Sequence, residues 1–232
     1  MTKRALLWVF VGLRVFQYGF AQDTKKKQLW LDVTNHFAVN EQFRIGGDAG
    51  IRGFVFDEEW TVLYLRPSIN YALNDRLTLH GGVGLFTAFV AEAGDTFEIR
   101  PRGGVRLRWP KIGKVLLEHY VRGEERYIRR EEQGDFRSFS RLRYRVGAYF
   151  PISGASLEEK GLYLPLLYEF FWVAGGDIPA MFMNHNRLVV GLGYRINSKW
   201  RIELQYTQML FREGVGTGLV PTAHVFRIRV KG

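Results

Sequence analysis

Apolar and polar side chains alternate residue by residue between positions 187 and 206. From Leu188 to Ile196 every second residue is apolar, and the residues between them are arginine, valine and glycine. The alternation resumes after Asn197-Ser198-Lys199 with Trp200, Ile202, Leu204 and Tyr206. Side chains on a β-strand point to opposite faces in turn, and Asn and Ser favour tight reversals. The stretch therefore predicts a β-hairpin with one apolar face and one polar face.

The same alternation recurs along the rest of the chain and predicts eleven strands. No segment after residue 27 keeps an apolar repeat of helical period for more than about two turns, so we expect little helix there. Strands joined by successive hairpins predict an all-β fold, an antiparallel up-and-down β-barrel of 10–12 strands. Single-chain bacterial membrane barrels have even strand counts, so 10 or 12 is expected. The predicted strands are residues 28–39, 43–54, 60–73, 76–89, 96–109, 115–128, 138–150, 161–173, 184–196, 200–211 and 221–231.

The first residues follow a different pattern. Lys3 and Arg4 precede an apolar run from Ala5 to Phe16, and Gly19-Phe20-Ala21 supplies the small residues that signal peptidase cleavage requires. We interpret residues 1–21 as a signal peptide for Sec-type export and residues 22–232 as the barrel. An amphipathic or buried N-terminal helix is the alternative, because Arg14 interrupts the apolar run.

Alternation alone does not say which face of the barrel meets water. A soluble exported barrel that binds an apolar ligand would turn the apolar face inward, whereas a membrane barrel does the reverse. The predicted strands of about 12–14 residues exceed the usual soluble strand and suffice for a tilted membrane span of about 9–11 residues. Aromatic residues also stand at the ends of apolar rows, as interfacial belts require. The sequence therefore favours a transmembrane barrel of the outer membrane with an Arg/Glu-rich lumen. The aromatic residues at the ends of the apolar rows are Trp109, Phe150, Trp172, Tyr194, Trp200 and Tyr206.

Four short motifs add a resemblance to a known family. They are Glu98-Ile99-Arg100-Pro101-Arg102, Arg122-Gly123-Glu124-Glu125-Arg126, Arg141-Leu142-Arg143-Tyr144-Arg145 and the run from Asn186 to Tyr194. In this order they resemble a family of exported β-barrel proteins known as a domain of unknown function, DUF2490, from the outer membrane of Gram-negative bacteria. The resemblance extends over most of residues 28–231. It implies the fold and the location, and it carries over no catalytic residue.

The polar face is rich in arginine. The chain has 33 basic and 23 acidic residues, a formal charge of +10. Guanidinium groups pair bidentately with carboxylates, and a small barrel has room for little beyond its own side chains, so one interpretation is an ion-paired lumen with a structural or scaffold role. The other is a narrow pore that attracts anions. The predicted lumen network is Arg66, Glu98, Arg100, Arg102, Arg106, Glu118, Arg122, Glu124, Arg126, Arg141, Arg143, Arg145, Glu169, Arg187, Arg195, Arg201 and Glu203.

The positive charge also bears on partners. An exported chain whose arginines alternate with apolar residues argues against nucleic acid. We expect outer-membrane lipid, the phosphate groups of lipopolysaccharide at the rim, and small anions as partners; the sequence names no protein partner.

Candidate catalytic chemistry is sparse. The chain has no cysteine and five histidines, and no histidine pair has metal-ligand spacing beside a carboxylate, so we expect no metal and no cofactor. Ser68, Asn70 and His80 share the predicted polar face and lie on strands joined by a tight turn. Because a nucleophile, a histidine base and an orienting polar group define a hydrolytic triad, a lipid-modifying barrel enzyme is the alternative to a non-enzymatic function. His119 falls on the predicted apolar face.

Overall fold

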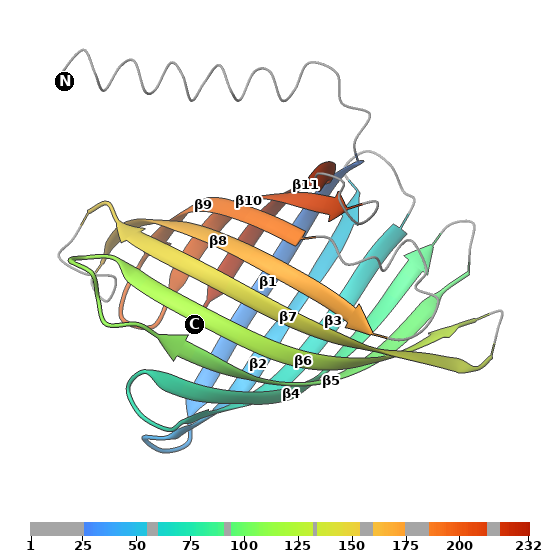
Figure 1. Ribbon diagram of the computed structural model, residues 1–232, viewed down its shortest axis with the longest axis horizontal. Coiled ribbons are helices and arrows are strands. Elements are labelled where there is room, and N and C mark those ends of the chain that lie inside the picture. The colour runs from blue at the N-terminus through green and yellow to red at the C-terminus, as the bar shows by residue number, and fades with distance from the viewer. Residues whose placement is uncertain are drawn as a thin grey trace, which may run out of the picture.

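Eleven β-strands close into a single barrel with strongly tilted strands (Figure 1). The computed structural model describes residues 26–54, 60–90, 94–131, 134–153, 160–174, 186–212 and 219–232. These residues form no helix. The strands are β1 (Lys26–Ala38), β2 (Phe43–Phe54), β3 (Trp60–Ala72), β4 (Leu77–Val90), β5 (Thr96–Arg108), β6 (Leu116–Arg130), β7 (Phe136–Pro151), β8 (Gly161–Ala174), β9 (Asn186–Arg195), β10 (Arg201–Arg212) and β11 (Leu219–Lys231).

The strand positions agree with those predicted from the alternation. Every strand begins and ends within two residues of its predicted bounds, which confirms the all-β fold and the barrel. The agreement follows from the length of the strands, because a period-two pattern sustained over a dozen residues has few other interpretations. The predicted signal peptide, residues 1–21, lies outside the described residues.

The barrel closes through a parallel pair. β1 runs parallel to β11, from Lys26 opposite Ala223 to Thr34 opposite Lys231, and all other neighbouring strands are antiparallel. Each hairpin reverses the chain direction, so an odd number of strands leaves the first and last pointing the same way. The expectation of 10 or 12 strands is therefore wrong, and the up-and-down antiparallel description holds for every pair except this one.

The two ends of the barrel differ in what they hold. The C-terminal mouth contains Gly232, the connections 39–42, 73–76, 109–115 and 196–200, and the end of β7 with the start of β8 (Figure 1). The opposite N-terminal mouth contains the start of β1, the ends of β2, β4, β6, β8 and β10, and the starts of β3, β5, β7, β9 and β11.

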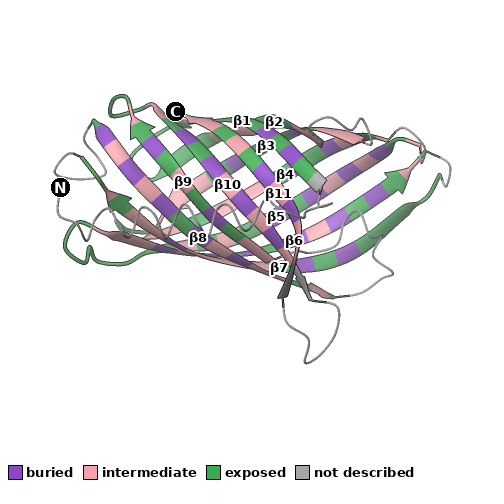
Figure 2. Ribbon diagram, turned by 90° about the horizontal axis from the view of Figure 1, so that it is seen from above, coloured by how far each residue is buried: buried purple, intermediate pink, exposed green. Residues whose placement is uncertain are grey.

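Burial alternates along the strands, and Figure 2 shows it as bands of buried and exposed residues. On β3, Tyr64, Arg66 and Ser68 are buried, whereas Leu63 and Leu65 between them are exposed. We call the two sides of the wall the buried face and the exposed face. Most of the large residues on the exposed face are apolar, and many on the buried face are charged. A small apolar cluster of Trp30, Met209, Ala223 and Val225 also belongs to the buried face.

Candidate functional site

The carboxylates of the buried face are each shared by several cations. Glu98 on β5 shows the pattern most fully. Arg100 donates to its two oxygens at 2.7 and 2.8 Å, and Arg126 from β6 donates to the same two at 2.6 and 2.7 Å. Bidentate contacts of this kind fix orientation as well as supplying attraction. One carboxylate thus ties together two guanidinium groups from adjacent strands.

Glu124 on β6 extends this group to the next strand. It pairs with Arg122 on its own strand and with Arg141 on β7, whose Nε donates at 3.1 Å. Arg100 lies 3.7 Å from the same carboxylate. Glu98 and Glu124 are therefore linked through Arg100 into one charged network across β5, β6 and β7.

Other carboxylates join strands in the same way. Glu118 lies between Arg145 of β7, at 2.9 Å, and Arg106 of β5, at 3.6 Å. The remaining contacts connect β2 with β3 and β5, β8 with β7 and β9, β1 with β11, and β10 with β11. They are Asp48 with Arg66 and Arg102, Glu169 with Arg143 and Arg187, Asp32 with Arg227 and Arg229, and Glu203 with Lys231 and Arg201.

Two tyrosines, Tyr64 and Tyr163, reach carboxylates across glycines. Tyr64 on β3 donates to Asp32 on β1, and the strand between them carries Gly50, where a Cβ would lie 2.6 Å from the tyrosine oxygen. A side chain at position 50 would therefore block the contact. The glycines of the buried face let partners two strands apart meet.

All the residues predicted for the lumen network lie on the buried face. Most are almost completely buried: Arg66, Glu98, Arg100, Arg102, Glu118, Arg122, Glu124, Arg126, Arg141, Glu169 and Glu203. The others are partly exposed, namely Arg106, Arg143, Arg145, Arg187, Arg195 and Arg201. Arg195 donates to the carbonyl of Ser198 at 3.0 Å in the following turn.

The buried face also holds residues that the predicted lumen network leaves out. Arg52 lies 4.2 Å above the Trp30 ring and 4.5 Å above the Tyr64 ring, and Lys231 bonds Glu203 at 2.7 Å. Trp30, Arg52 and Lys231 occupy the same alternate positions as Asp32, Asp48 and Arg229 on their own strands, so the alternation assigns all three to this face.

The structure joins two of the three residues considered for catalysis by a hydrogen bond and pairs the third with another residue. His80 Nδ1 lies 2.9 Å from Asn70 Oδ1 across the β3–β4 pair. Ser68 Oγ instead lies 3.2 Å from Nε2 of His36, which comes from β1. Hydrogen bonds therefore join His80 to Asn70 and Ser68 to His36. Catalysis by Ser68, Asn70 and His80 stays a prediction.

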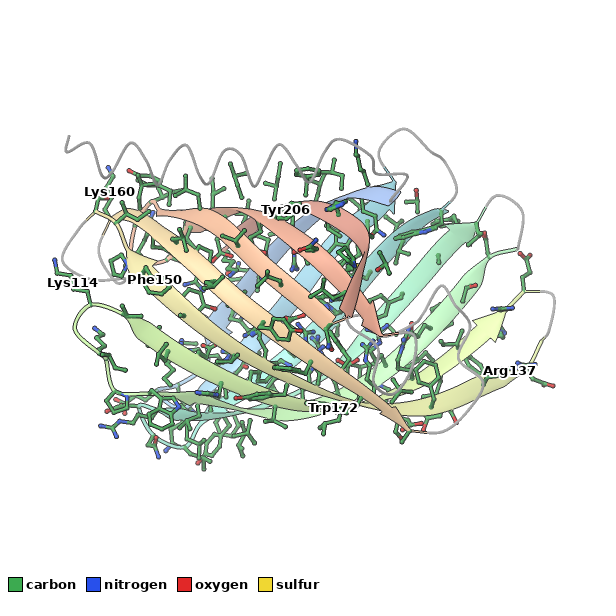
Figure 3. All side chains as sticks on the ribbon, turned by 45° about the horizontal axis from the view of Figure 1, so that its top comes forward. Lys114, Arg137, Phe150, Lys160, Trp172 and Tyr206 are labelled. Carbon is green, nitrogen blue, oxygen red and sulfur yellow. The ribbon has the colours of Figure 1, made fainter. Side chains whose placement is uncertain are left out.

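His119 lies on the exposed face within a row of aromatic rings. Its Nδ1 lies 2.6 Å from the Tyr144 hydroxyl, and its ring lies 5.8 Å from Trp109. The row continues through Phe170 to Trp172, with centroid separations of 5.9 Å. Figure 3 locates Phe150 and Trp172 near opposite ends of β7 and β8. The apolar exposed face thus includes aromatic residues near both ends of the barrel.

Within the described residues, no three histidine, aspartate or glutamate side chains gather closely enough to hold a metal ion. The carboxylates are instead engaged by arginine. The part of the chain described by the structure also contains no helix that is long and apolar enough to cross a membrane.

The fold and the site together define a closed β-barrel whose buried face is an arginine–carboxylate network. The sequence model of the family described as protein of unknown function (DUF2490) matches residues 27–215, and the chain belongs to that family. No curated protein matches the sequence.

Proposed function

We propose that this protein is a transmembrane β-barrel of the Gram-negative outer membrane, with a filled, ion-paired lumen and a structural or scaffold role. One observation carries the proposal, the inversion of polarity between the two faces. Leu65 and Leu204 are 54% and 55% exposed, whereas Glu98 and Glu203 are 2% and 1% exposed. A soluble barrel would have the opposite distribution.

The physical reason lies in the solvent that each face requires. Apolar surface in water costs about 25 cal/mol per Å² relative to an apolar environment, so a continuous apolar exterior favours contact with lipid. A closed sheet leaves no unpaired strand edge for the hydrocarbon to solvate. Burying the charges is tolerable because each carboxylate has cationic partners. The polarity of both faces therefore supports a membrane-spanning barrel over a soluble barrel that binds an apolar ligand.

The packing of the interior supports a scaffold over a wide channel. Trp30 on β1 is surrounded by guanidinium groups from several strands. Arg52, Arg187 and Arg227 lie 4.2, 5.3 and 5.6 Å from its rings. Arg187 belongs to β9, which is separated from β1 by β11 and β10 along the wall. Because side chains from strands so far apart meet at Trp30, they fill space inside the barrel. Filled space leaves little room for solutes.

A narrow, anion-attracting pore is the second candidate. The surplus of arginine on the buried face favours it, as does the partial exposure of Arg106, Arg195 and Arg201 near the C-terminal mouth. Cations that line a low-dielectric passage create an electric field, and this field concentrates anions in the passage.

Cell fractionation and heat-modifiable gel migration test the membrane proposal. We expect the protein in the outer-membrane fraction, with a folded band that shifts on boiling. A monodisperse monomer in detergent-free buffer would contradict it. Planar-bilayer recordings then separate the two roles, since a scaffold gives no discrete conductance steps and a pore does. Outer-membrane lipid and lipopolysaccharide are the partners that this location implies.

A further inference from the structure

The hairpin that joins β5 and β6 forms a defined projection at the C-terminal mouth. At its tip the backbone N–H of Ile112 donates to the carbonyl of Val115 at 3.2 Å, and the N–H of Val115 donates to the carbonyl of Ile112 at 3.0 Å. Gly113 has a φ of 59°, a conformation that tight hairpin turns require. The hydrogen bonds therefore hold the tip in one shape beyond the ends of both strands.

Apolar and cationic side chains are exposed together on this hairpin. Trp109 is 50% exposed and Ile112 is 64% exposed. Lys111 and Lys114 stand between and beside them in the chain, and both are exposed as well. Figure 3 shows Lys114 at the same end of the barrel as Phe150, another exposed residue of the apolar exterior. Side chains of these two kinds are found together where a protein meets the headgroup layer of a membrane.

A polar pair lies on the exposed face next to the hairpin. The His119 ring lies 5.8 Å from the Trp109 ring and 5.9 Å from the Tyr144 ring, and its Nδ1 lies 2.6 Å from the Tyr144 hydroxyl. The residues directly opposite His119 on the two neighbouring strands are Leu107 and Val146. Amphipathic rings at the end of an apolar row are typical of the boundary between hydrocarbon and headgroups. The hairpin tip therefore extends from this boundary toward the headgroups.

Few acidic groups oppose the two lysines. Glu118 precedes His119 in the chain, but it belongs to the buried face and pairs with Arg145 at 2.9 Å. The neighbouring connection, residues 73–76, is tied to the end of β5 by a backbone hydrogen bond of 2.8 Å from Arg108 to Arg76. Its one acidic residue, Asp75, is followed by the cationic Arg76. The two connections together therefore carry an excess of positive charge.

We propose that the β5–β6 hairpin is a binding site for an anionic phospholipid. Lys111 and Lys114 contact the phosphate group, and Trp109 and Ile112 lie along the glycerol and the first part of the acyl chains. A ligand that offered only charge would leave the exposed apolar side chains in water, and one that offered only acyl chains would make no use of the lysines. An amphipathic anion matches both kinds of side chain.

This inference rests on the proposed function and names one lipid class and one mouth of the barrel for it. Glycerophospholipids form the periplasmic leaflet of an outer membrane, whereas lipopolysaccharide forms the outer leaflet. The hairpin would therefore place the C-terminal mouth on the periplasmic side. The short connections 39–42, 73–76, 109–115 and 196–200 at this mouth agree with that orientation, because outer-membrane barrels have short periplasmic turns.

Native mass spectrometry of the purified barrel in a neutral detergent tests the site. The probes are dimyristoyl phosphatidylglycerol and dimyristoyl phosphatidylcholine, which have the same acyl chains and differ in headgroup charge. We expect the barrel to retain phosphatidylglycerol in preference to phosphatidylcholine. The double variant Lys111→Gln/Lys114→Gln should weaken retention of phosphatidylglycerol about tenfold, since each lysine near an anionic headgroup adds to binding. Trp109→Ala should weaken retention of both lipids.

The double variant Lys27→Gln/Arg129→Gln is the matched control. It removes two exposed cations from the N-terminal mouth and leaves the β5–β6 hairpin unchanged. Heat-modifiable migration verifies that each variant is folded. An equal loss of phosphatidylglycerol from both double variants would overturn the proposal, because it would show that net charge alone selects the lipid.

Equal retention of the two lipids by the unaltered barrel would also overturn the proposed site. The proposed function fails by a different observation, which is absence of the protein from the outer-membrane fraction. A barrel that is recovered from that fraction and retains both lipids equally would keep the proposed function and lose the phospholipid site.

Discussion

Tyr163 on β8 donates a hydrogen bond of 2.6 Å to Glu203 on β10, across the intervening strand β9. The phenol ring lies over Gly193, where a Cβ would approach its Cζ to 2.2 Å. Tyr64 and Asp32 have the same relation across β2. Glycine on the buried face therefore has a specific purpose, which is to let a phenol reach a carboxylate two strands away.

Gly193→Ala is expected to destabilise the barrel. The added methyl group must displace the Tyr163 ring, and overpacking of this kind costs about 1–3 kcal/mol. Urea unfolding in detergent measures the change. Gly123→Ala is the control, since a Cβ there meets nothing within 4 Å. Equal unfolding midpoints for the two variants would show that the ring does not need the glycine.

Glu98→Gln is expected to destabilise the barrel more strongly. It leaves Arg100 and Arg126 buried beside each other without the carboxylate that holds both, and breaking a buried ion pair costs about 3–5 kcal/mol. The same urea titration applies, with Glu125→Gln as the control because Glu125 is partly exposed and bonds only Ser140 among its described hydrogen bonds. A loss no greater than that of the control would contradict a structural role for this network.

Leu65→Arg tests the exposed face. On a lipid-facing strand an arginine near the middle of the membrane costs about 2–4 kcal/mol and should lower the yield of folded barrel in phospholipid vesicles. Leu73→Arg places the same substitution in the connection after β3 and should leave the yield unchanged. The fraction of heat-modifiable protein gives the readout. Unaltered folding of both variants would count against contact with lipid.

Trp30→Ala tests whether the interior is filled. Removing the indole leaves Arg52, Arg187 and Arg227 without the ring that they surround. We expect conductance steps in planar bilayers that the unaltered protein lacks. The control variant Trp109→Ala, on the exposed face, should show no conductance steps. Conductance steps of equal size in the unaltered protein and in the Trp30→Ala variant would indicate that the unaltered barrel is already an open pore.

The alternation of side chains was enough to place the strands and to assign residues to faces, because it samples one face at every second position. The alternation could not predict which strands pair to close the barrel. The parallel β1–β11 pair depends on where the first strand meets the last, which no local pattern records. It also could not pair Ser68 with His36, because their strands are not adjacent and the contact passes over Gly46 of β2. The specific arginine–carboxylate partners depend likewise on the register between strands.

The parallel closure separates the first and last residues of the barrel wall. Since Lys26 and Gly232 lie at opposite mouths of the barrel, a barrel that spans a membrane would present them to different compartments. An epitope fused after Gly232 and a second one inserted just before Lys26 would then be labelled from opposite sides of the cell envelope. An even-stranded barrel would display both to a single side.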